Sequence, residues 1–191
     1  MTTKIHIGGI DVLEPRKIVA DILAYRQKGT VLDLGAGFGR HALFLAFHGF
    51  TVTAVEKDEE KLARLRQQAL HLPADIKLIA EDVNNFDTTE KFDIVVATMI
   101  LHFLPQKEAQ AMIHKIKSWT KEGGLNIIAN YTDKNPEGLR TYQPNADELK
   151  KYYEDWNILQ YEESLDSLPN APIDGGPEKR WSLQMIAEKI T

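Results

Sequence analysis

Short apolar runs alternate with helical patterns along most of the chain. Four runs rich in valine and isoleucine predict β-strands at Thr30–Leu34, Thr51–Glu56, Ile76–Ala80 and Phe92–Thr98. A fifth strand is predicted over residues 125–131. Nearly continuous apolar runs are typical of strands that are buried on both faces. We therefore expect the first, fourth and fifth of these strands to lie in the centre of a mostly parallel sheet.

Helices are predicted before and between these strands. The segments with helical patterns are residues 15–28, 40–48, 59–71 and 105–121. The last of them has apolar residues at the i, i+3, i+4, i+7 spacing that produces one buried face. The glycine pair at residues 123–124 is expected to end this helix.

The C-terminal third of the chain changes pattern. A polar stretch, residues 132–144, precedes a short predicted helix that begins at Asn145, with Glu148 three residues on in a capping-box arrangement. Two further strands are predicted at residues 157–163 and 180–188. Because no helix separates them, these two strands predict an antiparallel pair at one edge of the sheet. The expected fold is α/β: a Rossmann-like three-layer sandwich with about seven strands.

Composition and charge indicate one globular domain that spans residues 1–191. The chain is 43% hydrophobic and 27% charged, with a net charge of -5, so it lacks the positive charge that attracts nucleic acid. It has no cysteine, and its six histidines show no metal-ligand grouping, so we expect no metal. Residues 1–11 lack the apolar core of a signal peptide, and no apolar run is long enough to span a membrane. We expect a cytoplasmic protein without a membrane partner; the sequence leaves its oligomeric state open.

The most informative segment is a glycine loop directly after the first predicted strand. It reads Asp33-Leu34-Gly35-Ala36-Gly37-Phe38-Gly39-Arg40. Closely spaced glycines permit a tight turn and let a ligand approach the backbone. Glu56 ends the second strand and follows Gly35 by 21 residues. Nucleotide-binding α/β domains place an acid at about this distance, where it accepts hydrogen bonds from the ribose hydroxyls. Together, the loop and the acid predict a nucleotide site rather than an ordinary turn.

The identity of the nucleotide follows from the details of the loop. A nicotinamide-binding loop requires glycine where this chain has Arg40. S-adenosylmethionine (SAM) has no phosphate, but it carries an ammonium group and a cationic sulfonium. Asp33, two residues before the loop, can serve the ammonium directly or through water. Arg40 itself either steers an anionic acceptor or holds the loop by a hydrogen bond, and we favour the second role.

These residues resemble those of the class I SAM-dependent methyltransferases over about residues 13–131. The shared features are the pattern D-x-G-x-G-x-G, the acid after the second strand and the pair Glu81-Asp82 after the third. The resemblance implies that Asp82 binds the adenine amino group, that the amide of Val83 meets a ring nitrogen and that Met99 packs against adenine. The expected cofactor-binding residues are Asp33, Gly35, Ala36, Gly37, Gly39, Arg40, Glu56, Lys57, Asp82, Val83 and Met99.

Methyl transfer from a sulfonium is an in-line displacement that depends mainly on alignment and exclusion of water. It requires neither a catalytic triad nor a metal. If a base is used, His102 is the first candidate, because it follows the fourth strand. The alternative is a partly buried histidine that bonds to the backbone. Tyr131, at the end of the fifth strand, is expected to line the acceptor pocket or to be an aromatic residue of its rim.

A finer resemblance concerns the acceptor. The compact length and residues 12–15 and 155–159 are similar to the small tellurite-resistance methyltransferases of the TehB type. That family carries His-Arg-His on its last strand, shortly after Gly-Pro. Here Arg180 matches the arginine, whereas Lys179 and Trp181 replace both histidines. This departure leaves the acceptor open.

The predicted function is SAM-dependent methyl transfer to a small-molecule or oxyanion acceptor, with S-adenosylhomocysteine (SAH) as product. The alternatives are a SAM-binding regulatory module without transfer activity and an NAD-dependent oxidoreductase.

Overall fold

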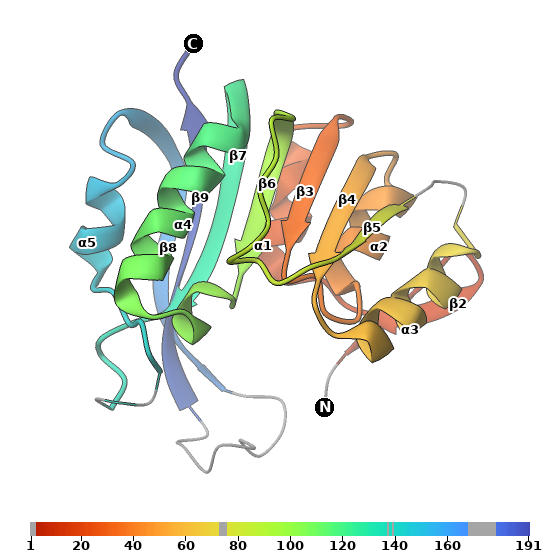
Figure 1. Cartoon of the computed structure of the whole chain (residues 1–191), viewed down its shortest axis with the longest axis horizontal. Coiled ribbons are helices and arrows are strands. Elements are labelled where there is room, and N and C mark those ends of the chain that lie inside the picture. Colours follow the sequence, from red (N-terminus) through yellow and green to blue (C-terminus); the bar gives the residue numbers. More distant parts are fainter. Residues whose placement is uncertain (1–2, 73–75, 137, 139, 168–178) are drawn as a thin grey trace.

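The structure is a computed structural model that describes residues 3–72, 76–136, 138, 140–167 and 179–191. A seven-stranded sheet forms its centre, with helices on both faces (Figure 1). The strands of this sheet are β3 (Thr30–Leu34), β4 (Thr51–Glu56), β5 (Ile76–Ala80), β6 (Phe92–Thr98), β7 (Thr120–Tyr131), β8 (Trp156–Ser167) and β9 (Lys179–Lys189). Both C-terminal strands are longer than predicted.

The strand order is β5-β4-β3-β6-β7-β9-β8. Neighbouring strands from β5 to β7 are parallel, whereas β9 is antiparallel to both β7 and β8. The chain fills one side of the sheet with β3, β4 and β5 and then returns to place β6 beside β3. Such a switch point opens a crevice at the C-terminal ends of the strands, which is where α/β proteins bind ligands. The architecture confirms the predicted Rossmann-like sandwich with an antiparallel edge pair.

The helices form two outer layers, each with its own apolar core. One core packs α1 (Lys17–Ala20), α2 (Arg40–Phe47) and part of α3 (Glu59–Ala69) against the sheet. The other packs α4 (Gln106–Trp119) and α5 (Ala146–Lys151); in Figure 1, α4 lies in front of β7 and β9, and α5 lies at the left edge of the view. Two short 3-10 helices, η1 (Asp21–Ala24) and η2 (Leu101–Phe103), are the remaining helical elements of the described residues. Across the described ranges, no helix has both the length and the apolar character that a membrane crossing requires.

Side-chain caps fix where two of the helices begin. The Asp58 carboxylate accepts hydrogen bonds from the amides of Glu60 and Lys61 at the start of α3. The Asn145 side chain accepts a hydrogen bond from the amide of Glu148 at 2.8 Å, as the sequence predicts for α5. Because each cap satisfies amides that the first helical turn leaves unbonded, it fixes the residue at which the helix begins.

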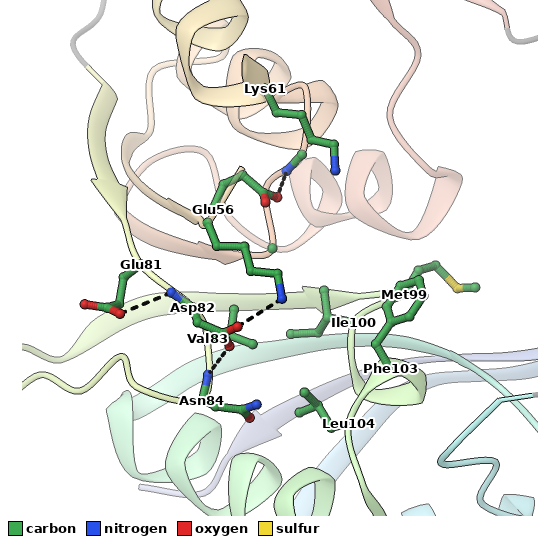
Figure 2. Close-up of a pocket in the computed structure, with 13 residues that line it drawn as sticks. Glu56, Lys61, Glu81, Asp82, Val83, Asn84, Met99, Ile100, Phe103 and Leu104 are labelled. Atoms are coloured by element: carbon green, nitrogen blue, oxygen red, sulfur yellow. Dashed lines mark hydrogen bonds and ion pairs between the residues drawn. The ribbon is translucent and has the colours of Figure 1, made fainter. Parts of the chain in front are cut away.

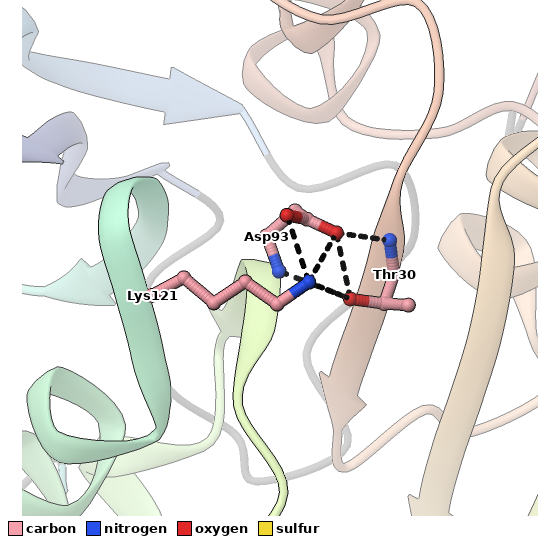
Figure 3. Close-up of polar contacts among 3 residues, drawn as sticks. All are labelled: Thr30, Asp93 and Lys121. Carbon is pink, nitrogen blue, oxygen red and sulfur yellow. Dashed lines mark hydrogen bonds and ion pairs between the residues drawn. The ribbon is translucent and has the colours of Figure 1, made fainter.

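A polar cluster ties three central strands together at the end of the sheet opposite the crevice (Figure 3). Asp93 on β6 accepts hydrogen bonds from the backbone amide and hydroxyl of Thr30 on β3, at 2.7 and 2.8 Å. Lys121 on β7 donates to the same carboxylate at 3.0 Å. These bonds oppose any sliding of β3, β6 and β7, whose other ends carry the candidate site.

The N-terminal segment differs from the prediction. Residues before α1 form a hairpin of β1 (Lys4–Ile7) and β2 (Ile10–Leu13), which the sequence analysis did not include. Gly8 and Gly9 form its two-residue turn, with φ of 54° and 82°. Positive φ at both positions is the geometry that tight hairpins require. The helix predicted over residues 15–28 is also shorter, because α1 passes into η1, where Tyr25 bonds to the Ile22 carbonyl three residues back.

The boundary between α4 and β7 also corrects the prediction. The helix ends at Trp119, and the strand begins at Thr120, so the glycine pair at residues 123–124 lies within β7 instead of ending the helix. Thr120 pairs with Phe92, and the next pair joins Leu125 to Ile94. The intervening residues bulge out of the ladder, a conformation that the φ of +70° at Gly123 permits.

Candidate functional site

A cavity of about 570 Å³ opens at the C-terminal ends of β3, β4, β5 and β6 (Figure 2). Seven of the expected cofactor-binding residues line it: Gly35, Gly37, Glu56, Lys57, Asp82, Val83 and Met99. Six further residues line it that the expected set did not contain: Lys61, Glu81, Asn84, Ile100, Phe103 and Leu104. The predicted loop, acid and strand-end segments therefore meet around one space.

Glu56 is directed at the glycine loop, as Figure 2 shows. Its Oε2 accepts a hydrogen bond from the Gly37 amide at 2.8 Å, and its Oε1 accepts one from the Asp58 amide at 3.0 Å. The side chain is 8% exposed. A carboxylate offers about four acceptor positions, so these two bonds leave one position on each oxygen. That is the arrangement needed to accept two neighbouring hydroxyl groups.

Two of the loop glycines, Gly37 and Gly39, are required for different structural reasons. A Cβ added to Gly37 would meet no atom within 4 Å, so this position faces open space and allows a ligand to approach the backbone. A Cβ on Gly39 would lie 2.2 Å from Leu65 on α3, so this glycine permits close packing. Gly39 does not line the cavity, and neither does Ala36, whose amide bonds to the Val55 carbonyl.

Asp33 lies on β3 beneath the loop and is 1% exposed. The Ala42 amide bonds to its carboxylate, but Oδ2 has no hydrogen-bond partner in the described part of the chain. Burial raises the pKa of Asp33 to about 7; the Ala42 bond opposes this shift, and the charge of Glu56 adds to it. Asp33 does not line the cavity. Its orphaned oxygen is suited to a cationic group or a water molecule placed at the loop.

Asp82 occupies the opposite wall, at the end of β5. Its Oδ1 accepts a hydrogen bond from the Asn84 amide at 3.0 Å, and its Oδ2 pairs with Lys57 at 3.0 Å. These contacts, the Asn84 amide first, lower the pKa of Asp82. Lys57 directly follows Glu56, so its side chain joins the ends of β4 and β5 across the cavity mouth.

The remaining wall is apolar and follows β6. Met99 has a φ of 57°, and among the described residues it alone, glycines apart, has a positive φ. Such strain costs about 1–3 kcal/mol and persists where the surroundings impose it, often at binding sites. Ile100, Phe103 and Leu104 continue this wall, and Phe103 is 66% exposed. Sequence analysis did not select these three because apolar residues beside a buried strand look like core.

His102 and Tyr131 lie together just outside the cavity lining, with ring centroids 4.7 Å apart. Burial, together with the charges of Arg140, Arg16 and Arg180, lowers the pKa of His102 to about 3. The imidazole is therefore neutral at physiological pH. A group whose protonated form is this unfavourable is a poor proton acceptor, and the low pKa is therefore unfavourable to the general-base role suggested for His102.

Two arginines lie near the Tyr131 ring of this pair. The guanidinium carbons of Arg180 and Arg140 lie 5.3 and 5.7 Å from the Tyr131 ring centroid. Arg40, in contrast, donates through Nε to the Glu14 carbonyl at 2.8 Å and does not line the cavity. This contact supports the interpretation of Arg40 as a residue that holds the loop to the N-terminal segment. Arg140 was absent from the predicted site.

Two further predictions concern metal and the last strand. The described ranges contain no group of three or more histidine, aspartate or glutamate residues placed to hold a metal ion. Lys179, Arg180 and Trp181 lie at the start of β9, whereas Gly176 and Pro177, which match the family's Gly-Pro, lie outside the described residues.

Comparison with known proteins shows the family. The profile of the family described as tellurite resistance protein TehB matches residues 4–183. The "Probable S-adenosyl-L-methionine-dependent methyltransferase TehB" of Haemophilus influenzae is 33% identical, over 98% of this chain and 63% of that protein. The crystal structure of TehB from Haemophilus influenzae superposes with a TM-score of 0.84 at 30% identity, over 92% of this chain and 62% of that one.

A more distant match supports the fold alone. The N-methyltransferase NodS from Bradyrhizobium japonicum, crystallised with SAH, has a TM-score of 0.72 at 16% identity, over 91% of this chain and 84% of that one. The present chain spans less than two thirds of the length of the TehB relatives. The family profile and the 33% identity nevertheless cover nearly the whole of it, so the chain belongs to the tellurite resistance protein TehB family.

Proposed function

We propose that this domain binds SAM in the cavity at the C-terminal ends of β3 to β6 and transfers its methyl group to a small-molecule or oxyanion acceptor. The observation that carries the proposal is the Glu56 carboxylate, which is bonded to the Gly37 amide and keeps an acceptor position on each oxygen. The relatives named as SAM-dependent methyltransferases support the same ligand.

The residues present fit each part of SAM. Glu56 would accept the two ribose hydroxyls through its remaining acceptor positions. Asp82 and the Val83 amide, with Met99, would hold the adenine between polar and apolar walls. The orphaned Oδ2 of Asp33 would attract the ammonium group, directly or through a water molecule at the loop.

The chain's contribution to the reaction is alignment. SAM supplies a methyl group already activated by its sulfonium. Tyr131 and His102 are buried and pack against each other, and they would exclude water from one side of the reacting methyl group. Holding both reactants in line can contribute about 7–11 kcal/mol to lowering the barrier. Since His102 is a poor base here, we propose that the acceptor attacks as an anion or through a lone pair, without losing a proton to the protein.

The charges beside Tyr131 favour a negatively charged acceptor. Arg140 and Arg180 lie near its ring, and both act electrostatically on His102. An oxyanion such as tellurite, which the family's description names, has the charge that these guanidinium groups attract. Lys179 and Trp181 stand where the family's two histidines are expected, so recognition here would rest on permanently charged arginine.

One set of measurements tests the proposal against its alternatives. Isothermal titration calorimetry with SAM, SAH and NAD should give binding for the first two only. Transfer of a labelled methyl group to tellurite or selenite should then follow. Binding of SAM without transfer to any acceptor would favour a regulatory module. Binding of NAD in preference to SAH would favour an oxidoreductase and contradict the proposal.

A further inference from the structure

His41 is a buried histidine in the first turn of α2, directly after the glycine loop, and it is 5% exposed. Its Nε2 accepts a hydrogen bond from the backbone amide of Arg16 at 3.4 Å. Its Nδ1 lies 3.2 Å from the hydroxyl oxygen of Thr98, the last residue of β6. The next residue along α2, Ala42, donates its amide to the Asp33 carboxylate on β3. The first turn of α2 is therefore bonded to both strands at the switch point of the sheet.

The two contacts of the His41 ring define its protonation state. A backbone amide can only donate a hydrogen bond, so Nε2 carries no proton while it accepts from Arg16. Burial lowers the pKa of His41 to about 3, and the charges of Arg40 and Arg16 add to this shift. The ring is thus neutral at physiological pH, and its one proton is on Nδ1, which donates to Thr98. His41 is a bridge with a fixed direction and not an acid or a base.

The Thr98 end of this bridge lies next to the strained residue of the cavity wall. Met99 has a φ of 57° and lines the cavity beside Ile100 (Figure 2). The Met99 amide donates to the Ala129 carbonyl on β7 at 2.7 Å. On the other side of Met99, Ile100 packs so closely against Gly35 that a Cβ added to this glycine would lie 2.4 Å from Ile100 Cγ2. A strained backbone persists only where its surroundings hold it, and these contacts hold the residues before and after Met99.

We propose that His41 is a positioning residue for the cofactor, which acts through Thr98 to hold Met99 in the conformation that forms the adenine wall. His41 does not itself line the cavity, so its effect on a ligand has to pass through its neighbours. The inference rests on the proposed function, since Met99 is expected to pack against the adenine of SAM. The competing explanation is that His41 serves only to attach the N-terminal segment through its bond to Arg16.

Substitutions that keep one of the two bonds distinguish these explanations. His41→Asn places an amide N–H close to the position of Nδ1–H and keeps the bond to Thr98. His41→Gln places an amide oxygen close to the position of Nε2 and keeps only the bond to Arg16. Thr98→Val removes the hydroxyl from the other partner and changes the shape of the side chain little. His48→Gln is the matched control, because His48 is a partly buried histidine at the other end of α2.

Calorimetric titration with SAH measures the effect of each variant on the cofactor site. We expect the Kd of SAH to rise about tenfold in His41→Gln and Thr98→Val, but by less than about twofold in His41→Asn and His48→Gln. The ligand 5′-methylthioadenosine lacks the amino-acid part of SAH and should lose the same factor, because the adenine wall is affected. Hydrogen exchange of the Met99 amide in the free protein should be faster in His41→Gln and unchanged in His41→Asn.

The other outcomes would overturn the proposal in different ways. Equal affinity for SAH in wild type, His41→Gln and Thr98→Val would show that the bridge does not affect the cofactor. Equal weakening in His41→Asn and His41→Gln would show that the bond to Thr98 is not the one that matters. Weakening of SAH without weakening of 5′-methylthioadenosine would place the effect at the amino-acid end and contradict the assignment to Met99.

Failure of the proposed function would be recognised separately. If wild type binds no SAH, the proposed function is wrong, and the exchange rate of the Met99 amide alone decides whether His41 holds this turn. An unchanged exchange rate in His41→Gln would then overturn that role as well. If His41→Gln does not fold, as judged by circular dichroism, Thr98→Val provides the same test, because it removes the same bond and leaves the His41 ring in place.

Discussion

Removal of the Glu56 carboxylate should separate cofactor binding from folding. In Glu56→Ala, the ribose would lose two hydrogen bonds to a charged acceptor, each worth about 1.5–3 kcal/mol. Water that enters the vacated space offsets part of this loss, so we take the lower end, about 3 kcal/mol. That difference corresponds to at least about 100-fold weaker binding of SAH.

The same substitution should also destabilise the free protein moderately. Glu56 bonds the amides of Gly37 and Asp58, and both amides would lose their partner. Relief of the unfavourable charge of Glu56 on Asp33 acts in the opposite direction. We expect the free energy of unfolding to fall by about 2 kcal/mol, which leaves the protein folded at 25 °C.

Calorimetric titration with SAH measures the first effect, and urea denaturation measures the second. Glu60→Ala is the matched control, because Glu60 is an exposed acid on the adjacent turn of α3. A 2′,3′-dideoxy analogue of SAH should bind wild type and Glu56→Ala equally, since it lacks the hydroxyls concerned. A folded Glu56→Ala that binds SAH as tightly as wild type would refute the reasoning.

Three further predictions follow from buried or bonded ionisable groups. Asp93→Ala should lower the free energy of unfolding by about 1–2 kcal/mol at pH 7 in urea denaturation. Burial raises the pKa of Asp93, but bonds from Thr30 and Lys121 outweigh this effect and keep the pKa low. The stability that the Asp93 carboxylate contributes should therefore be lost from wild type as the pH falls below about 4. The stability of Asp93→Asn should not show this loss. Because the pKa of Asp33 is raised to about 7, calorimetry should show SAM affinity rising up to about tenfold per pH unit from pH 5 to 7, as the carboxylate that attracts the ammonium forms. Asp33→Asn should abolish the pH dependence of SAM affinity. The free energy of unfolding of wild type should fall as the pH rises from 5 to 7, because the raised pKa of Asp33 stabilises the folded state only while the carboxyl is protonated. His102→Gln should reduce kcat by less than about tenfold, rather than the 10²–10⁴-fold of a lost general base, and leave its pH profile between 5 and 8 unchanged.

The cofactor side of the site was largely predictable from the sequence because its signals are local. Gly35 and Gly37 directly follow a buried strand, and Glu56 ends the next strand along the chain. Parallel strands that are adjacent in the sheet bring their C-terminal ends together, so sequence spacing translates into spatial proximity. The same reasoning placed Asp82 at the cavity.

Element boundaries were less predictable, although one missed element had a signal. The Gly8–Gly9 pair between apolar positions is a recognised hairpin pattern, and the hairpin β1–β2 forms there. The start of β7 had no comparable signal. Thr120 joins the ladder because it pairs with Phe92, a contact between residues far apart in sequence that overrides the local preference for a helix end at the glycines.

The acceptor side could not be predicted, because it is assembled from distant segments. Arg140 follows β7 and Arg180 lies near the start of β9, so only the packed sheet brings their guanidinium groups to Tyr131. The low pKa of His102 likewise depends on burial and on these arginines. Neither property is present in any short stretch of the sequence.

The central claim is that Gly37 and Glu56 bind the ribose of SAM. A crystal structure of the protein with SAH tests it most directly. The account predicts both ribose hydroxyls at hydrogen-bond distance, about 2.5–3.0 Å, from the Glu56 carboxylate, with the adenosine beside Gly37. SAH bound elsewhere, or bound in the cavity with its ribose turned away from Glu56, would contradict the account.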